Sequence, residues 1–341
     1  MNLKQLSNIL GLSQTTVSRA LNGFPEVSET TRQRVQMVAD QYGYSPNTRA
    51  KSLATGRSMA IGHVIPVSEK HEMVNPVFGD FIAGAGESYA RHGYDMHLSL
   101  FDHGSESDIY TKLKMRRSVD GVVVHGPQMD DPRIDLLRKL DMPFVVHGRS
   151  SNQTGPYSWV DVNSRSSFEQ ATSYLLDLGH KRIGLINGYE IMDFAYRRRT
   201  GYETALKTWG VAVDPALMRS DEMTEAHGYR SARDILNLSD PPTAFLCSSM
   251  ICALGTRRAI EDSGQKMGRD ISVITHDDCL SYLQTDGDIP VFTSVKSSVR
   301  NAGRCLGDML IHQINTPTEG PVHKLLEAEL TVGTSTGPAP L

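Results

Sequence analysis

The stretch GLSQTTVSRALNG (Gly11–Gly23) carries side chains of the types that hydrogen-bond DNA bases. Gln14 and Thr15 stand at the start of an expected helix, and Arg19 follows on the same face about one turn later. Glutamine can form two hydrogen bonds with an adenine, and arginine can bond O6 and N7 of a guanine. Short polar side chains nearby suit phosphate oxygens, which fix register without reading sequence. These are Thr16, Ser18 and Asn22. The alternative is a solvated helix face whose Ser and Thr residues only cap.

Three short helices are expected to position these side chains. Apolar residues at helical spacing fill Leu3–Leu10, and Gly11 ends this helix. Ser13 is a typical N-cap for a second helix that starts at Gln14, and a third helix follows Ser28. Two short helices joined by a tight turn with a glycine are typical of a helix-turn-helix domain. The expected core consists of Leu6, Ile9, Leu12, Val17, Leu21, Val35 and Val38.

The charge distribution separates the first 60 residues from the rest. They contain seven Lys or Arg and three acidic residues, a net charge of +4, whereas the whole chain carries −4. The rest of the chain therefore carries −8. A basic segment on an acidic body indicates a polyanionic partner for that segment, and the alternative is an ordinary solvated face.

The segment SPNTRAKSLATGRS (residues 45–58) predicts a short helix or a linker. Asn47 is a possible cap, but two helical turns are marginal alone in water, so this helix needs a partner. Leu53 is its one large apolar side chain, and a wedge between base steps in the minor groove would use it. A disordered linker with an incidental leucine is the other interpretation.

The motifs LKQLSNILGLSQTTVSRALNG, VSETTRQRV, YGYSPNTRAKSLATGRS and IGHVIP resemble the lactose-repressor (LacI) family of bacterial transcription regulators. The resemblance implies a DNA-binding domain at 1–45, a hinge at 46–58 and an effector-binding and dimerisation domain at 59–341. It implies that the hinge folds on operator DNA, with Leu53 intercalating and Ala50 packing beside it. It also gives the base-reading role to Gln14, Thr15 and Arg19.

The body alternates apolar runs with amphipathic stretches, which predicts an α/β fold with doubly wound parallel sheets. The expected strands are Ala60–Pro66, Met96–Leu100, Gly121–Val124, Phe144–Val146, Arg182–Ile186, Thr243–Leu246 and Ser272–Thr275. A Ser-, Asn-, Gly- and Pro-rich break at Arg149–Ser164 predicts a crossover between two lobes. By resemblance to the periplasmic sugar-binding-protein fold, the first lobe takes residues 59–160 and 292–320, and the second takes 161–291 and 321–334.

Ligands of such sheets bind at the carboxyl ends of strands, which places a candidate effector site there. A sugar site needs an Arg fork, a carboxylate and an aromatic face. The resemblance assigns the first two to Arg198 and Asp277, and Ser248 follows another strand. Phe78 and Phe194 are candidate stacking rings. A surface Arg, an N-cap Asp and core Phe residues are the structural alternatives.

Three positions depart from the family pattern. Ser248-Ser249 stands where Asn-Asp is common, His276 replaces an aromatic residue, and Gly148 replaces an Asp. The hydrogen bonds to an effector therefore cannot be copied from a relative.

Other chemistries find little support. GTSTG (Gly333–Gly337) fits a serine-hydrolase pattern, but no histidine follows it. The HDD run that begins at His276 lacks further residues at metal-ligand spacing. We expect no cofactor, no metal and no enzymatic activity. The four cysteines show no CxxC spacing, and the chain has neither a secretory signal nor a membrane-spanning run, which predicts a cytoplasmic protein.

Together these features predict a homodimeric repressor that binds an inverted-repeat operator in double-stranded DNA and responds to a small sugar between its lobes. The segments HEMVNPVFGDF, VHGP and ITHDD resemble regulators of α-glucoside use, and another disaccharide or a phosphorylated sugar stays open. A periplasmic solute-binding protein and a sugar-processing enzyme are the rival classes. The tail shows no heptad repeat, which argues against a tetramer built on a terminal coiled coil.

Overall fold

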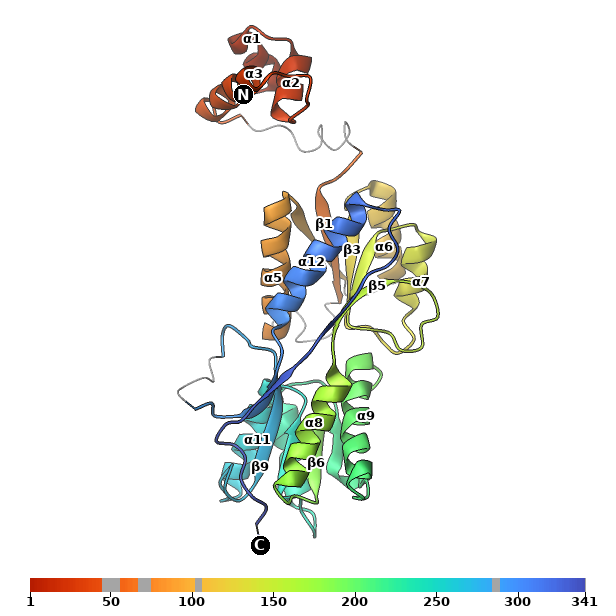
Figure 1. Cartoon of the computed structure of the whole chain (residues 1–341), viewed down its shortest axis with the longest axis vertical. Coiled ribbons are helices and arrows are strands. Elements are labelled where there is room, and N and C mark those ends of the chain that lie inside the picture. Colours follow the sequence, from red (N-terminus) through yellow and green to blue (C-terminus); the bar gives the residue numbers. More distant parts are fainter. Residues whose placement is uncertain (45–55, 67–74, 102–105, 284–288, 341) are drawn as a thin grey trace. The chain divides into compact units, whose positions relative to one another are not determined.

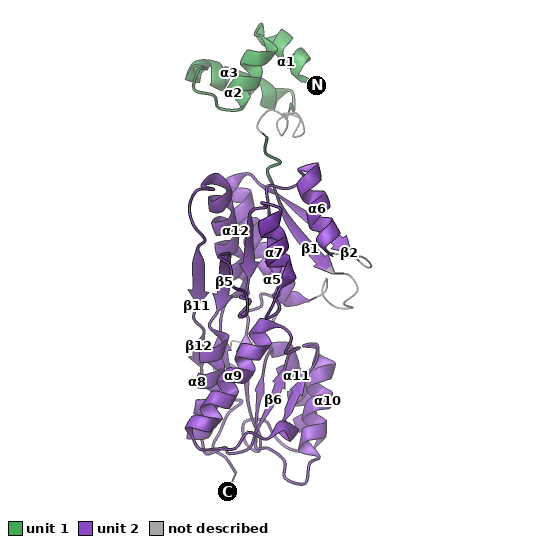
Figure 2. Ribbon diagram, turned by 90° about the vertical axis from the view of Figure 1, so that its right-hand side faces the viewer, with its two compact units in different colours: residues 1–59 green, residues 60–341 purple. Residues whose placement is uncertain are grey.

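The computed structural model describes residues 1–44, 56–66, 75–101, 106–283 and 289–340 (Figure 1). The chain divides into two units, Met1–Met59 and Ala60–Leu341 (Figure 2). Most of the predicted hinge, including Ala50 and Leu53, lies outside the described residues. In the part of the chain that is described, no helix is both long and apolar enough to cross a membrane.

The first unit contains three helices whose ends follow the local capping signals. They are α1 (Leu3–Leu10), α2 (Gln14–Leu21) and α3 (Glu29–Gln41). Gly11 ends α1 with a left-handed φ of 65°, which glycine adopts without strain. Ser13 caps α2 by accepting a 3.0 Å hydrogen bond from the backbone N of Thr16. The predicted helix-turn-helix is confirmed, helix by helix.

The core of this unit is mostly the predicted one. Leu6, Val17 and Val35 are fully buried, and Leu12, Leu21 and Val38 pack at its margin. The prediction for Ile9 was wrong, because its side chain is 49% exposed. Leu10, Ala20, Val27 and Ala39 complete the core instead.

The second unit contains two six-stranded sheets, each with helices on both faces (Figure 1). In the first sheet the order is β11-β5-β4-β3-β1-β2. Its strands are β1 (Ala60–Pro66), β2 (Asp95–Phe101), β3 (Gly121–His125), β4 (Phe144–His147), β5 (Ser158–Val162) and β11 (His323–Leu326), all parallel. With α5 (Pro76–His92), α6 (Glu106–Arg116), α7 (Pro132–Lys139) and α12 (Val299–Asn315) it forms what we call the first lobe.

The second sheet has the order β12-β10-β9-β8-β6-β7. Its strands are β6 (Ile183–Asn187), β7 (Met218–Ser220), β8 (Ala244–Cys247), β9 (Ser272–Asp277), β10 (Thr293–Lys296) and β12 (Glu329–Thr331). Only β12 runs antiparallel to its neighbour. With α8 (Ser164–Asp177), α9 (Asp193–Thr208), α10 (Glu225–Leu236), α11 (Met250–Asp262) and the 3₁₀ helix η2 (Pro215–Leu217) it forms the second lobe.

The chain passes between the lobes three times, and two of the predicted lobe boundaries need correction. The first passage, between β5 and α8, falls inside the predicted break. Residues 293–296 were assigned to the first lobe, but β10 pairs with β9 in the second sheet. Residues 323–326 were assigned to the second lobe, but β11 pairs with β5 in the first sheet. Both strands have only four residues, so local sequence gives little sign of their partners.

Helix α12 returns to the first lobe and packs closely along α5 (Figure 1). Glycine permits this approach, because a Cβ at Gly84 would lie 1.9 Å from the carbonyl oxygen of Arg300. On the other face, Tyr110 of α6 is fully buried beneath the sheet.

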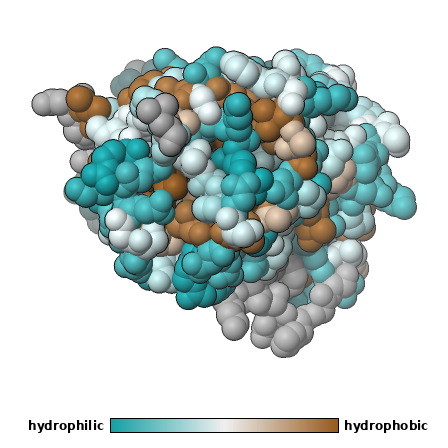
Figure 3. All heavy atoms as spheres, turned by 90° about the horizontal axis from the view of Figure 1, so that it is seen from below, coloured by the Kyte–Doolittle hydropathy of each residue, from teal (hydrophilic) through white to brown (hydrophobic). Residues whose placement is uncertain are grey.

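At the end of the molecule seen in Figure 3, hydrophobic side chains occur in small groups between hydrophilic ones.

Candidate functional site

The exposed face of α2 carries the predicted base-reading residues. Gln14, Thr15 and Arg19 are all exposed. No described residue accepts a hydrogen bond from the Arg19 guanidinium, whereas Arg34 Nη2 donates to Leu10 O at 2.9 Å and Arg32 is held by Glu29 at 2.9 Å. Arg19 in the first unit, unlike Arg32 and Arg34, therefore has a guanidinium that is available to a ligand.

The predicted phosphate contacts are partly engaged within the helix. Thr16 Oγ1 lies 2.8 Å from Ser13 Oγ, at the N-cap. Asn22 Nδ2 donates to the Ser18 carbonyl at 2.8 Å, at the end of α2. Both side chains thus stabilise the ends of the helix and keep one free acceptor each for solvent or a partner.

Arg198 of α9 lies buried between aromatic rings at the facing ends of the two sheets. Its residue exposure is 6%, and its Cζ is 4.9 Å from the Phe194 ring centre and 5.2 Å from that of Phe168. Its Nη1 donates to the Ser248 carbonyl at 2.5 Å, while Nε is buried without a partner. Burial lowers the Arg198 pKa to about 10, against the opposing effect of Asp278 and Asp161. The guanidinium stays charged and has an unused donor.

Ser248 supports Arg198 and is itself held by a residue that sequence reasoning missed. Ser248 Oγ donates to Asn187 Oδ1 at 2.6 Å, and both residues are fully buried. Asn187, the last residue of β6, also donates from Nδ2 to Ala195 O at 2.9 Å. A polar residue at the end of a buried apolar strand was the signal that could have identified it.

The buried Arg198 guanidinium and the carboxylate of Asp278, the residue after the predicted Asp277, act on each other electrostatically. The Asp277 carboxylate accepts from Cys279 N at 2.8 Å, and burial raises its pKa. Asp278 Oδ1 lies 3.3 Å from His276 Nε2. Burial opposes ionisation of Asp278, but His276, Arg198 and His147 outweigh it and lower the pKa. Asp277, whose carboxylate is bonded to the backbone two residues further on, stays a predicted effector contact.

His276 occupies the position where the resemblance implies an aromatic residue. Its side chain is 1% exposed, and its Nδ1 is buried without a hydrogen-bond partner. Arg198 Nε and His276 Nδ1 are thus two unpaired polar atoms on the second lobe in the same neighbourhood. Unpaired buried polar atoms are costly, which favours a ligand as their partner.

The first lobe presents rings and imidazoles at the ends of its strands. Phe78, near the start of α5, lies edge-on to His125 with the ring centres 5.3 Å apart. Phe81 stacks on His147 at 4.2 Å. The Phe78 ring is thus partly buried and lies beside polar groups. The Phe194 ring, by contrast, covers the Arg198 guanidinium.

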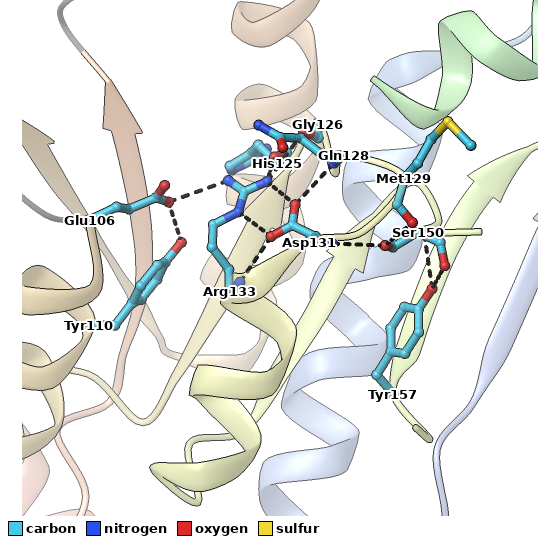
Figure 4. Close-up of polar contacts among 10 residues, drawn as sticks. All are labelled: Glu106, Tyr110, His125, Gly126, Gln128, Met129, Asp131, Arg133, Ser150 and Tyr157. Atoms are coloured by element: carbon cyan, nitrogen blue, oxygen red, sulfur yellow. Dashed lines mark hydrogen bonds and ion pairs between the residues drawn. The ribbon is translucent and has the colours of Figure 1, made fainter. Parts of the chain in front are cut away.

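A polar network holds the loops after β3 and β4 in place (Figure 4). Arg133 donates to the His125 carbonyl at 2.9 Å and to Asp131 Oδ2 at 2.6 Å. The Asp131 backbone N in turn donates to Ser150 Oγ at 3.2 Å. Although burial disfavours both charges, their mutual bonds lower the pKa of Asp131 and raise that of Arg133. This permanent ion pair fixes the backbone on which His125 is presented.

The two lobes also contact each other directly. Arg197 Nη2 donates to Ser151 Oγ at 2.9 Å, and the Ser151 backbone N donates to Asp193 Oδ1 at 3.2 Å. Within the described ranges, no three His, Cys, Asp or Glu residues are arranged to hold a metal ion. Arg198, His276 and Asp278 of the second lobe act on one another electrostatically, and His147 of the first lobe also acts on Asp278.

Comparison with known proteins points in the same direction. Residues 7–47 match the bacterial regulatory proteins of the lacI family, and residues 172–336 match a periplasmic binding protein-like domain. The HTH-type transcriptional regulator AglR of Rhizobium meliloti (strain 1021) is 44% identical over 340 residues, covering 100% of this chain and 95% of AglR.

Solved structures extend the likeness to the whole fold. The transcriptional regulator CelR–cellobiose complex has a TM-score of 0.73 and 26% identity, covering 98% of this chain and 99% of that one. The Lac repressor dimer bound to operator and the anti-inducer ONPF has a TM-score of 0.83 and 23% identity, covering 99% of each chain.

Proposed function

The chain belongs to the lacI family of bacterial regulatory proteins, and from this premise we propose that it represses an operon for carbohydrate use and responds to a small sugar. It is a DNA-binding transcriptional regulator, as AglR is. The observation that carries the sugar proposal is the buried Arg198 guanidinium with its unpaired Nε. A neutral sugar offers many hydroxyl oxygens to such a donor and an apolar ring face to the neighbouring phenylalanines.

The operator is proposed to be an inverted repeat bound by a homodimer. A twofold dimer places one α2 in the major groove of each half-site, where Gln14, Thr15 and Arg19 face the base edges. The Lac repressor structure to which this fold is similar is a dimer bound to operator. Leu53 and Ala50 remain predicted hinge contacts to the minor groove, and Leu53→Ala is expected to weaken operator binding while sparing sugar binding.

The effector is proposed to be an α-glucoside. Support comes from the likeness of HEMVNPVFGDF, VHGP and ITHDD to regulators of α-glucoside use. The related CelR structure contains cellobiose, which is a disaccharide. Sugar binding changes the closure of the lobes and so shifts the population of the DNA-binding conformation.

Two measurements test the proposal. Isothermal titration of the full chain with maltose, sucrose, trehalose, cellobiose and ribose is expected to give saturable binding for an α-linked disaccharide. Gel shifts with the promoter region of the neighbouring genes should then show that this sugar changes operator affinity. Binding of cellobiose alone would remove the α-glucoside assignment, and an absence of any preference for a palindrome over random duplex would remove the repressor assignment.

A further inference from the structure

A chain of three hydrogen-bonding side chains runs through the first lobe. His63 of β1 is fully buried, and its Nε2 lies 3.0 Å from the Tyr89 hydroxyl. Its Nδ1 lies 2.9 Å from Nε2 of His125, the last residue of β3. Tyr89 is 1% exposed, whereas His125 is partly exposed at the end of the sheet. The chain therefore leads from the helix layer to the facing ends of the strands.

Both histidines are neutral at neutral pH. Burial lowers the pKa of His63 to about 3. Burial, together with His63, His147 and Arg133, lowers the pKa of His125 well below its ordinary value. A neutral imidazole has one N–H donor and one acceptor nitrogen, so each ring must choose which nitrogen carries the proton.

The Tyr89 hydroxyl decides which atom donates and which accepts in each of these two hydrogen bonds. In the described part of the molecule its only hydrogen-bond partner is His63 Nε2. If His63 Nε2 carried a proton, the buried hydroxyl proton of Tyr89 would have no acceptor, at a cost of about 1–3 kcal/mol. Tyr89 therefore donates to His63 Nε2, and His63 Nδ1 carries the proton and donates to His125 Nε2. The remaining proton of His125 must then reside on Nδ1.

We propose that Tyr89 and His63 are positioning residues that fix His125 in the tautomer presenting an Nδ1–H donor to the effector. No described residue is bonded to His125 Nδ1. The His125 ring is held between His63 and the edge-on Phe78, and its backbone carbonyl is held by Arg133. The nitrogen is thus rigidly placed and free of protein partners.

This tautomer selects among ligand groups. A fixed donor favours an oxygen that can accept, such as a hydroxyl, a ring oxygen or a glycosidic oxygen. It rejects a group that can only donate, such as the ammonium of an amino sugar, because two donors would face each other. The identity of the ligand as a sugar rests on the proposed function, but the tautomer does not.

Histidine tautomers can be read directly by long-range ¹H–¹⁵N correlation spectra of the full chain labelled with ¹⁵N-histidine. His63→Gln and His125→Gln variants assign the two rings. We expect His125 to show a protonated Nδ1 and an unprotonated Nε2 at pH 7.5 without ligand. A proton on Nε2, or a charged ring, would overturn the inference.

Tyr89→Phe removes the hydroxyl and keeps the ring. In this variant either histidine can be the donor in the hydrogen bond between His63 and His125, so His125 should show a mixture of tautomers. Affinity for the α-glucoside that the wild type binds should fall about two- to tenfold, in proportion to the lost donor population. Tyr202→Phe is the matched control, since Tyr202 is equally buried and loses a bond to Ile183 O in the other lobe. An unchanged His125 tautomer in Tyr89→Phe would contradict the proposal that Tyr89 and His63 fix this tautomer.

The two proposals fail separately. If no sugar in the panel binds but the spectra show Nδ1–H on His125, the sugar assignment falls and the tautomer proposal stands. If an α-glucoside binds while His125 carries its proton on Nε2, the tautomer proposal alone is wrong.

Discussion

Asp80 and Ser281, in different lobes, form two hydrogen bonds. The Asp80 carboxylate accepts from the Ser281 backbone N at 2.8 Å and from its hydroxyl at 2.7 Å. Arg300 Nη1 lies 3.7 Å from the same carboxylate. Helix α5 of the first lobe is thereby tied to the segment that follows β9 and carries Asp278. A link of this kind couples the distance between the lobes to the geometry of the candidate effector site.

Asp80→Ala should therefore loosen the arrangement of the lobes. Loss of two hydrogen bonds to a charged acceptor is expected to destabilise the conformation with closed lobes by about 1–3 kcal/mol. Effector affinity should fall accordingly. Isothermal titration gives the affinity, and small-angle scattering gives the lobe separation. Asp308→Ala is the matched control, because Asp308 bonds Ser88 and Arg91 within the first lobe. Equal effects of both variants would show that Asp80 has no special role in closure.

Arg198→Lys should separate sugar binding from DNA binding. Lysine keeps the charge but loses the planar guanidinium, in which one nitrogen donates to Ser248 O while Nε stays available to a ligand. We expect sugar affinity to fall about ten- to a hundredfold, or ~1.4–2.8 kcal/mol, with operator affinity unchanged in the absence of sugar. Arg182→Lys, whose partners Asp214 and Asp240 lie away from the site, serves as the control. Sugar affinity that survives Arg198→Lys would exclude Arg198 from the site.

Arg19→Ala should relax sequence specificity at one base pair in each half-site. Loss of a bidentate contact to guanine costs about 1–3 kcal/mol at that position. Competition gel shifts against operators substituted at single positions measure the effect. Lys4→Ala, which removes an exposed charge from α1, should lower affinity evenly across sequences if it has any effect. A uniform loss in Arg19→Ala would reassign Arg19 to a phosphate.

The buried histidines predict a stability that depends on pH. Burial lowers the pKa of His63 to about 3 and that of His147 to about 4, so the folded state binds protons less readily than the unfolded chain. The stability they permit is complete above about pH 6.5 and is lost as the pH falls toward these values, by up to about 1.4 kcal/mol per pH unit for each ring.

Urea unfolding at pH 7.5, 6.0 and 5.0 measures this slope. His63→Gln should reduce it, because glutamine cannot take up the proton. His97→Gln, at a partly exposed position on β2, is the comparison. The same slope in wild type and His63→Gln would mean that other groups cause the acid sensitivity.

Much of the fold could be predicted from local sequence. The turn at Gly11, the cap at Ser13 and the strand Ala60–Pro66 depend on neighbouring residues, and each was found at the predicted place. Arg198 was proposed by resemblance, and the structure places it, buried, in the helix that follows β6. Short strands such as His323–Leu326 could not be assigned, because four residues pair with whichever edge the distant chain supplies.

The sequence by itself determined the helix-turn-helix, the alternation of strands and helices, and the residue types at the strand ends, because these depend on contacts a few residues apart. Only the tertiary structure decided that the charge of Asp278 acts on Arg198, that Asn187 holds Ser248, and that Tyr89, His63 and His125 are linked by hydrogen bonds. Those relationships join residues separated by tens of positions. Their geometry is set by sheet order and helix packing, which no local pattern contains.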